Sequence, residues 1–74
     1  MSNTESINER FPLASDSQKL RIHETLDTLA AFERTNPKRA TLLDAEYLGI
    51  AQAYSEALSE ANATNAMQFN AIVH

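Results

Sequence analysis

The chain has 74 residues, of which 43% are hydrophobic and 22% charged; its formal net charge is −4 and it contains no cysteine. This length predicts a single domain, and the lack of cysteine excludes disulfides and thiolate zinc sites as a means of stabilising it. Because so short a chain buries only about 60% of its unfolded surface, we expect tight helix packing or association with another chain.

Several functional classes are excluded by pattern. The sequence has no apolar run long enough to span a membrane, and its first ten residues are polar, unlike a secretory signal. It also lacks a glycine-rich phosphate loop, zinc-ligand spacing, a nucleophile elbow and a basic patch with interleaved aromatic residues. We therefore expect a cytoplasmic protein that is not an enzyme, needs no cofactor or metal, and binds neither nucleic acid nor membrane.

Residues 1–14 are rich in small polar residues and contain Pro12, a composition that predicts a flexible N-terminal arm with at most a single helical turn. Ile7 and Phe11 are four residues apart and can share one apolar face. Ser15 and Gln18 have the spacing of a capping box, in which each side chain accepts a hydrogen bond from the other residue's backbone N–H. A helical domain, residues 15–74, is therefore expected to begin here.

The first predicted helix covers about residues 16–35. Its apolar side chains recur at helical spacing on one face: Ile22, Leu26, Leu29, Ala30 and Phe32. It ends before Pro37, because the residue preceding a proline is pushed out of the helical region. Either Asn36 or Thr41, the latter together with Asp44, can cap the helix that follows.

The second predicted helix covers about residues 42–72. One apolar stripe at spacings of three and four runs along it: Leu43, Tyr47, Ile50, Ala51, Tyr54, Leu58, Ala61, Asn65, Phe69 and Ile72. Poor helix formers cluster at Asn62 to Asn65, so a break there into a short third helix is the main alternative. The resulting fold class is all-α: an antiparallel helical hairpin with an N-terminal arm.

The two predicted helices differ in length, about 30 Å against about 46 Å. In an antiparallel hairpin the last turns of the second helix, with Met67, Phe69, Ile72 and Val73, project beyond the first helix. The N-terminal arm or a second chain has to cover these apolar residues. We expect both solutions together, giving a dimeric helical bundle.

All six cationic side chains lie in residues 1–39, so residues 40–74 carry the entire net charge of −4. Such a helix favours a basic protein partner. Glu56 and Glu60 lack further ligands at metal-binding spacing and are read as part of a solvated acidic face. His23 is read as a solvated or boundary residue, and Gly49 as a place where another helix can approach closely.

We therefore predict a binding surface along the second helix, made of Tyr47, Ile50, Tyr54, Glu56, Leu58, Glu60, Phe69 and Ile72. For the two tyrosines, packing within the chain against Phe32 and Leu29 is the favoured interpretation, and a place in the interface is the alternative. The predicted function is protein–protein interaction by a small acidic protein, of the kind that phages or mobile elements encode to inhibit or adapt a host protein complex. The alternative, from another class, is a structural subunit that polymerises through the same stripe.

Overall fold

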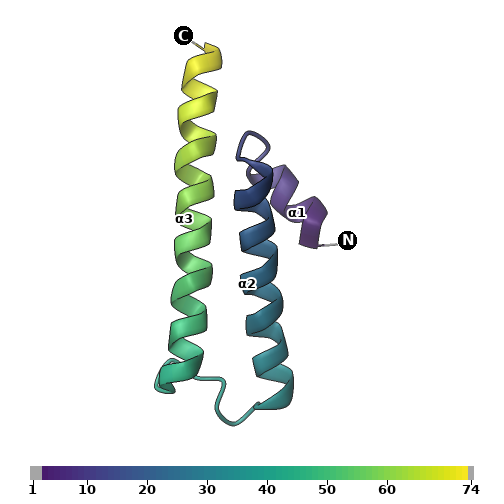
Figure 1. Cartoon of the computed structure of the whole chain (residues 1–74), viewed down its shortest axis with the longest axis vertical. Coiled ribbons are helices and arrows are strands. Elements are labelled where there is room, and N and C mark those ends of the chain that lie inside the picture. Colours follow the sequence, from purple (N-terminus) through teal and green to yellow (C-terminus); the bar gives the residue numbers. More distant parts are fainter. Residues whose placement is uncertain (1–2, 74) are drawn as a thin grey trace.

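A computed structural model describes residues 3–73 of the chain, which form three helices: α1 (Asn3–Arg10), α2 (Asp16–Thr35) and α3 (Ala45–Val73). The predicted all-α fold class is confirmed. In Figure 1, α2 and α3 lie side by side and run in opposite directions, while α1 packs against the N-terminal half of α2. The molecule is elongated, measuring 49 × 24 × 15 Å.

Helix α2 begins and ends as its sequence predicts. The Ser15 hydroxyl accepts a hydrogen bond from the backbone N–H of Gln18 at 3.2 Å, and the Gln18 side-chain oxygen accepts one from the backbone N–H of Ser15 at 3.1 Å. The capping box is therefore confirmed, and it satisfies two of the free N–H groups of the first turn. At the other end, the backbone N–H of Asn36 donates to the Phe32 carbonyl at 2.8 Å, immediately before Pro37.

Helix α3 starts three residues later than predicted, and its cap is neither Asn36 nor Thr41. Asp44 Oδ1 accepts hydrogen bonds from the backbone N–H groups of Glu46 at 3.0 Å and Tyr47 at 3.1 Å. Leu43, placed on the apolar stripe by the periodicity, instead lies in the connection and is 96% exposed. Asp44 displaces the other two caps because an aspartate at this position satisfies two N–H groups at once and favours the positive end of the helix dipole.

The alternative of a helix break between Asn62 and Asn65 is wrong, since α3 is continuous from Ala45 to Val73. The polar side chains of this segment are engaged by other parts of the chain. Thr64 accepts a hydrogen bond from the Gln18 side chain, and Asn65 accepts one from the backbone of Leu13. Polar side chains with outside partners compete less with the backbone of their own helix.

Helix α1 has eight residues, more than the single turn expected for the arm. Its apolar face, Ile7 with Phe11 just beyond the helix end, is buried where the three helices meet. The core there consists of Ile7, Phe11, Ala14, Ile22, Ala57 and Ala61. Burial of these apolar groups stabilises a segment whose polar composition alone does not favour a helix.

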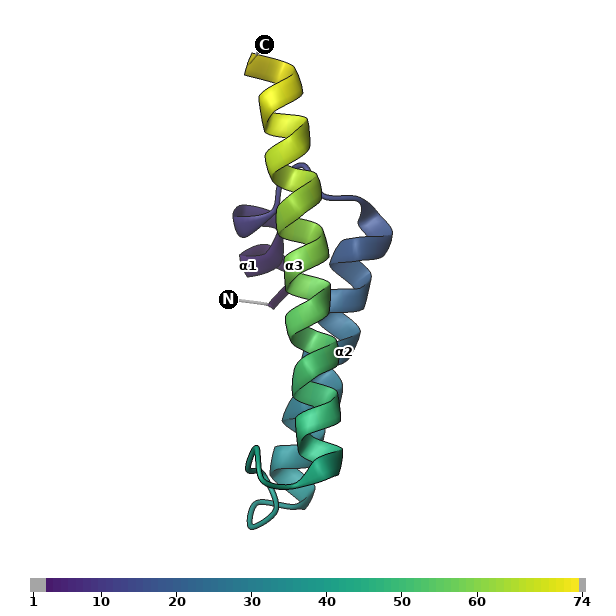
Figure 2. The same cartoon turned by 90° about the vertical axis from the view of Figure 1, so that its left-hand side faces the viewer.

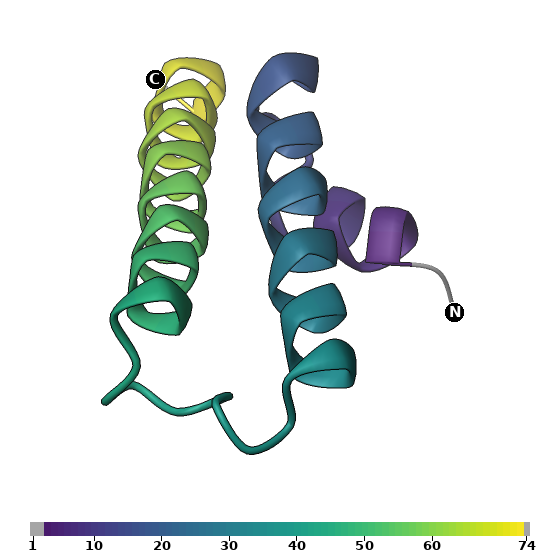
Figure 3. The same ribbon diagram turned by 60° about the horizontal axis from the view of Figure 1, so that its bottom comes forward.

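The connection between α2 and α3 spans residues 36–44 and is the loop that comes forward in Figure 3. Arg39 organises it. Its guanidinium lies 5.3 Å from the centre of the Phe32 ring and forms ion pairs with Asp44 at 2.9 Å and Glu46 at 3.0 Å. Leu42 is 62% exposed and Leu43 is 96% exposed at this end of the molecule.

Candidate protein-binding surface at the end of α3

The packing of α3 against the rest of the chain reaches as far as Asn65. The Gln18 side-chain N–H donates to Thr64 Oγ1 at 2.8 Å, and the backbone N–H of Leu13 donates to Asn65 Oδ1 at 2.9 Å. Every residue from 66 to 73 is exposed. We call residues 66–73 the α3 tip; at 1.5 Å per residue it projects about 12 Å beyond the start of α2. Figures 1 and 2 show it extending past both other helices.

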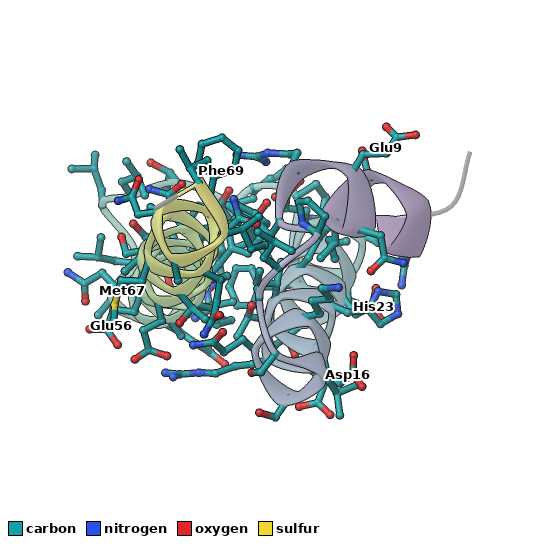
Figure 4. All side chains as sticks on the ribbon, turned by 90° about the horizontal axis from the view of Figure 1, so that it is seen from above. Glu9, Asp16, His23, Glu56, Met67 and Phe69 are labelled. Atoms are coloured by element: carbon teal, nitrogen blue, oxygen red, sulfur yellow. The ribbon has the colours of Figure 1, made fainter. Side chains whose placement is uncertain are left out.

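The α3 tip presents large apolar side chains to solvent. Met67 is 70% exposed, Phe69 57%, Ile72 71% and Val73 61%. Phe69 and Ile72 follow Asn65 at intervals of four and three residues, so they continue the face that α3 packs against α1 and α2 lower down. Seen along the helix in Figure 4, Met67 lies on the opposite side from Phe69. The apolar surface therefore reaches around much of the helix end.

No charged side chain occurs in residues 61–73. The end of α3 is thus apolar or neutral over more than three turns, in a chain whose net charge is −4. Of the predicted binding residues, Phe69 and Ile72 lie on the tip. The predicted binding surface did not include Met67 and Val73, which also lie there. Their hydropathy and the difference in length between the two predicted helices were signals that could have identified them.

The other apolar residues of the predicted surface are partly buried by the chain itself. The Tyr47 ring packs 5.7 Å from the Phe32 ring, centre to centre, and its hydroxyl donates to Glu33 Oε1 at 3.1 Å. Burial, together with this bond to Glu33, raises the pKa of the Tyr47 hydroxyl. Tyr54 and Leu58 pack against the core, and Ile50 is half-buried. These four residues help to hold α3 in place and are separate from the tip.

Glu56 and Glu60 are exposed to solvent on α3, and an arginine lies beside them. Arg21 reaches across from α2, with its Nη1 2.7 Å from Glu60 Oε2 and its Nη2 3.9 Å from Glu56 Oε2. All three side chains remain about half exposed or more, so the contact is screened by water and contributes little stability. It does, however, place a cation beside both carboxylates.

The same holds at the beginning of α3. Hydrogen bonds from Arg39 and from the backbone N–H groups of Tyr47 and Glu46 lower the pKa of Asp44, while Asp44 and Glu46 together raise the pKa of Arg39. Each of the four acidic residues in the second half of the chain therefore lies within 4 Å of an arginine. Two arginines are shared among these four carboxylates, so they offset only part of the negative charge that the sequence places on this half of the chain.

His23 lies beside a shallow hollow between α1 and α2. Its Nε2 is 3.3 Å from Asp27 Oδ2, and its Nδ1 is buried without a hydrogen-bond partner. The hollow is lined by Ile7, Asn8, Asp16, Lys19, Leu20 and His23. None of the residues that line it is a serine, threonine or cysteine. Within residues 3–73, no three His, Cys, Asp or Glu side chains are grouped so as to hold a metal ion.

No protein-family model, curated protein or solved structure matches this chain. Among the helices that the structure describes, none is both long enough and apolar enough to cross a membrane.

Proposed function

We propose that this chain is a small non-catalytic protein that acts by protein–protein interaction, with the α3 tip of its helical hairpin as the binding surface. The observation that carries this proposal is the exposure of Met67, Phe69, Ile72 and Val73 on a helix end that the rest of the chain leaves uncovered. Contiguous apolar patches on small proteins are typical of interaction sites. A helix end of this kind fits a hydrophobic groove that takes anchor residues at spacings of three and four.

The proposed biological role is that of an inhibitor or adaptor of a protein complex, of the kind encoded by phages and mobile elements. A protein in this role needs a surface and no catalytic group, and a chain of this size can supply one. Because residues 61–73 carry no charged side chain, the partner site for the tip is proposed to be apolar and not basic. A partner groove that desolvates Phe69 would gain most of its affinity from that side chain.

A structural subunit remains the second candidate, because the elongated molecule has apolar side chains at both ends. Leu42 and Leu43 are exposed in the connection, at the end opposite the tip. A contact between the tip of one copy and the connection of the next would be heterologous, and such contacts build open filaments when the rotation does not close. This candidate requires both ends, whereas the first requires only the tip.

The test is a pair of matched double variants. Phe69→Lys with Ile72→Lys places charge on the tip, and lysine near a helix C-terminus is favourable for the helix dipole, so α3 should stay helical by circular dichroism. Leu42→Lys with Leu43→Lys makes the same change in the connection. Partners captured by crosslinking in the native host are purified, and their affinity for each variant is measured. We expect at least a tenfold loss for the tip variant alone; equal affinity for the tip variant and the unmodified chain would refute the proposal.

A further inference from the structure

We infer that α1 is a strap that opens and closes over one side of the α2–α3 hairpin, turning about Pro12 while α2 and α3 stay paired. In its closed position it shields Tyr54 and Leu58, two residues of the predicted binding surface. The inference goes beyond the proposed function, because it concerns the middle of α3 and does not depend on what the tip binds.

Two apolar side chains hold α1 against the outside of the hairpin (Figure 3). Ile7 is 7% exposed and Phe11 5%, and both belong to the core. The other side chains of α1 that the structure describes are exposed: Ser6, Asn8, Glu9 and Arg10. For these described side chains, hydrogen bonds to the hairpin begin only after the helix, with the bond from Leu13 to Asn65. Helix α1 is therefore attached along one narrow apolar line.

The packing around α1 leaves space on both sides of that line. A hollow of about 120 Å³ lies under α1 and is lined by Ile7 together with Tyr54 and Leu58. A second hollow, of about 290 Å³, lies between α1 and α2 beside His23. Apolar groups that border such space have fewer atoms within contact distance than groups in a close-packed core. The two anchors therefore hold α1 less firmly than their burial alone suggests.

Helix α1 depends on this attachment for its own structure. It has eight residues, fewer than the roughly 12–15 at which isolated helices become marginally stable in water. Ser6, Ile7 and Asn8 in its second half are weak helix formers. Ordering the segment also costs conformational entropy, which the two anchors have to offset. Loss of the contact and loss of the helix are therefore one cooperative step.

The loop that follows α1 gives the strap a fixed base. The backbone N–H of Leu13 donates to Asn65 Oδ1 at 2.9 Å, and Ala14 is buried in the core. Pro12 directly precedes these fixed points and is exposed. The turn bond from the Ala14 N–H to the Phe11 carbonyl, 3.2 Å long, crosses this point and breaks when α1 opens. The hinge therefore lies at Pro12.

The α2–α3 pair has contacts of its own at both ends. Near the connection the Phe32 and Tyr47 rings pack 5.7 Å apart, centre to centre. At the other end the Gln18 side chain donates to Thr64 Oγ1 at 2.8 Å. None of these four residues contacts α1 through the hollows that border it. The hairpin therefore keeps these contacts when the strap is open.

Opening of α1 changes the middle of α3. Tyr54 and Leu58 are half-buried in the closed chain and pack against the core to which α1 contributes. Once Ile7 and Phe11 leave that core, both residues gain exposure to solvent. Access to them is then limited by the fraction of chains in which α1 is open. The strap is in this sense an autoinhibitory contact built into the fold.

The first measurement is native-state hydrogen exchange by NMR on the full, unmodified chain. The amides of residues 7–11 should be protected at least about tenfold less than those of residues 22–26 and 57–61, and to a similar degree as one another. Equal protection in all three helices would overturn the inference, because α1 would then open only with the whole chain. Fraying from the N-terminus would also overturn it, and would leave the Phe11 amide as protected as α2.

Ile7→Ala is the variant that releases the strap, and Asn8→Ala is its matched control on the exposed side of α1. In Ile7→Ala, residues 7–11 should lose their remaining protection. Residues 22–26 and 57–61 should lose no more than the factor by which α1 was protected before, because weakening a contact that is already open has no further effect. Asn8→Ala removes no core contact and improves helix propensity, so it should not lower protection in α1. An equal loss in all three helices of Ile7→Ala would overturn the inference.

The second measurement is the exposure of side chains to a soluble paramagnetic probe. In Ile7→Ala the probe should broaden the signals of Tyr54 and Leu58 more than in the unmodified chain. The signals of Phe32 and Tyr47, which pack together near the connection, should be unchanged. Equal broadening of all four residues would show that the hairpin opens together with α1, and no change at Tyr54 and Leu58 would show that α1 does not shield them. Either result would overturn the inference.

Discussion

The backbone N–H of Leu13 donates a hydrogen bond of 2.9 Å to the side-chain oxygen of Asn65, 52 residues further along the chain. This bond joins the loop between α1 and α2 to α3 at the last point where α3 is covered. In the sequence, Asn65 reads as an interruption of the apolar stripe and a weak position in the helix. In the structure it satisfies a backbone donor that has no partner within its own loop, and it marks the boundary between packed helix and tip.

Replacing Asn65 with alanine should therefore destabilise the chain. The change leaves the partly buried Leu13 N–H without its acceptor, at a cost of about 1–3 kcal/mol. Alanine is the better helix former by about 0.5 kcal/mol, which offsets part of the loss. We expect the free energy of unfolding in urea to fall by about 1 kcal/mol.

Asn62→Ala is the matched control, because Asn62 is exposed on the same helix one turn earlier. It has the same gain in helix propensity without the lost bond, so it should leave stability unchanged or raise it by about 0.5 kcal/mol. Equal stability of the two variants would mean that the Leu13 to Asn65 bond contributes nothing.

Gly49 should be replaceable by alanine with a gain in stability. A Cβ added there meets no atom within 4 Å, so the expected close approach of another helix does not occur within this chain. Glycine inside a helix costs about 0.5–1 kcal/mol relative to alanine. We expect Gly49→Ala to raise the urea midpoint and leave the slope unchanged. A loss of stability that grows with protein concentration would instead show that a second chain packs closely at Gly49.

The cap of α3 gives a pH dependence of known sign. Hydrogen bonds to Arg39 and to the backbone lower the pKa of Asp44 in the folded chain, so the unfolded chain binds this proton at a higher pH than the folded one. The contribution of the Asp44 carboxylate to stability is complete above the ordinary aspartate pKa of about 3.9. This contribution is lost as the pH falls through the lower pKa that Asp44 has in the folded chain.

Asp44→Asn isolates this effect, because asparagine also caps helices but does not titrate. Between pH 5 and pH 2 we expect the melting temperature of the unmodified chain to fall more steeply than that of the variant. At neutral pH, the difference in melting temperature between the unmodified chain and Asp44→Asn should become smaller at about 1 M salt, because salt screens exposed ion pairs. Melting curves that shift in parallel for both proteins would show that Asp44 is not held in its charged form.

The sequence predicted those features that depend on local chemistry. The capping box at Ser15 and the proline at position 37 define α2, and the difference in helix length locates the uncovered tip. The features it missed depend on contacts between distant residues. Helix α1 is stabilised by burial against Ile22 and α3, and Arg21 meets Glu60 only once α2 and α3 are antiparallel. The cap at Asp44 could have been predicted from the sequence, since an aspartate directly before a helical run is a local signal for a helix N-terminus.

The side chain of Ala61 is fully buried in the core that the three helices share. A leucine there must displace its neighbours, and overpacking of this kind destabilises by about 1–3 kcal/mol. Ala63→Leu is the matched control: it adds the same atoms to an exposed position two residues away, and leucine and alanine are both good helix formers. We expect urea unfolding to show a lower midpoint for Ala61→Leu and little change for Ala63→Leu. If the two variants unfold at the same urea midpoint, the core has space for a larger side chain at Ala61. The three helices would then not be closely packed at this point in solution, and the boundary between the packed part of α3 and the tip would not be defined by that packing.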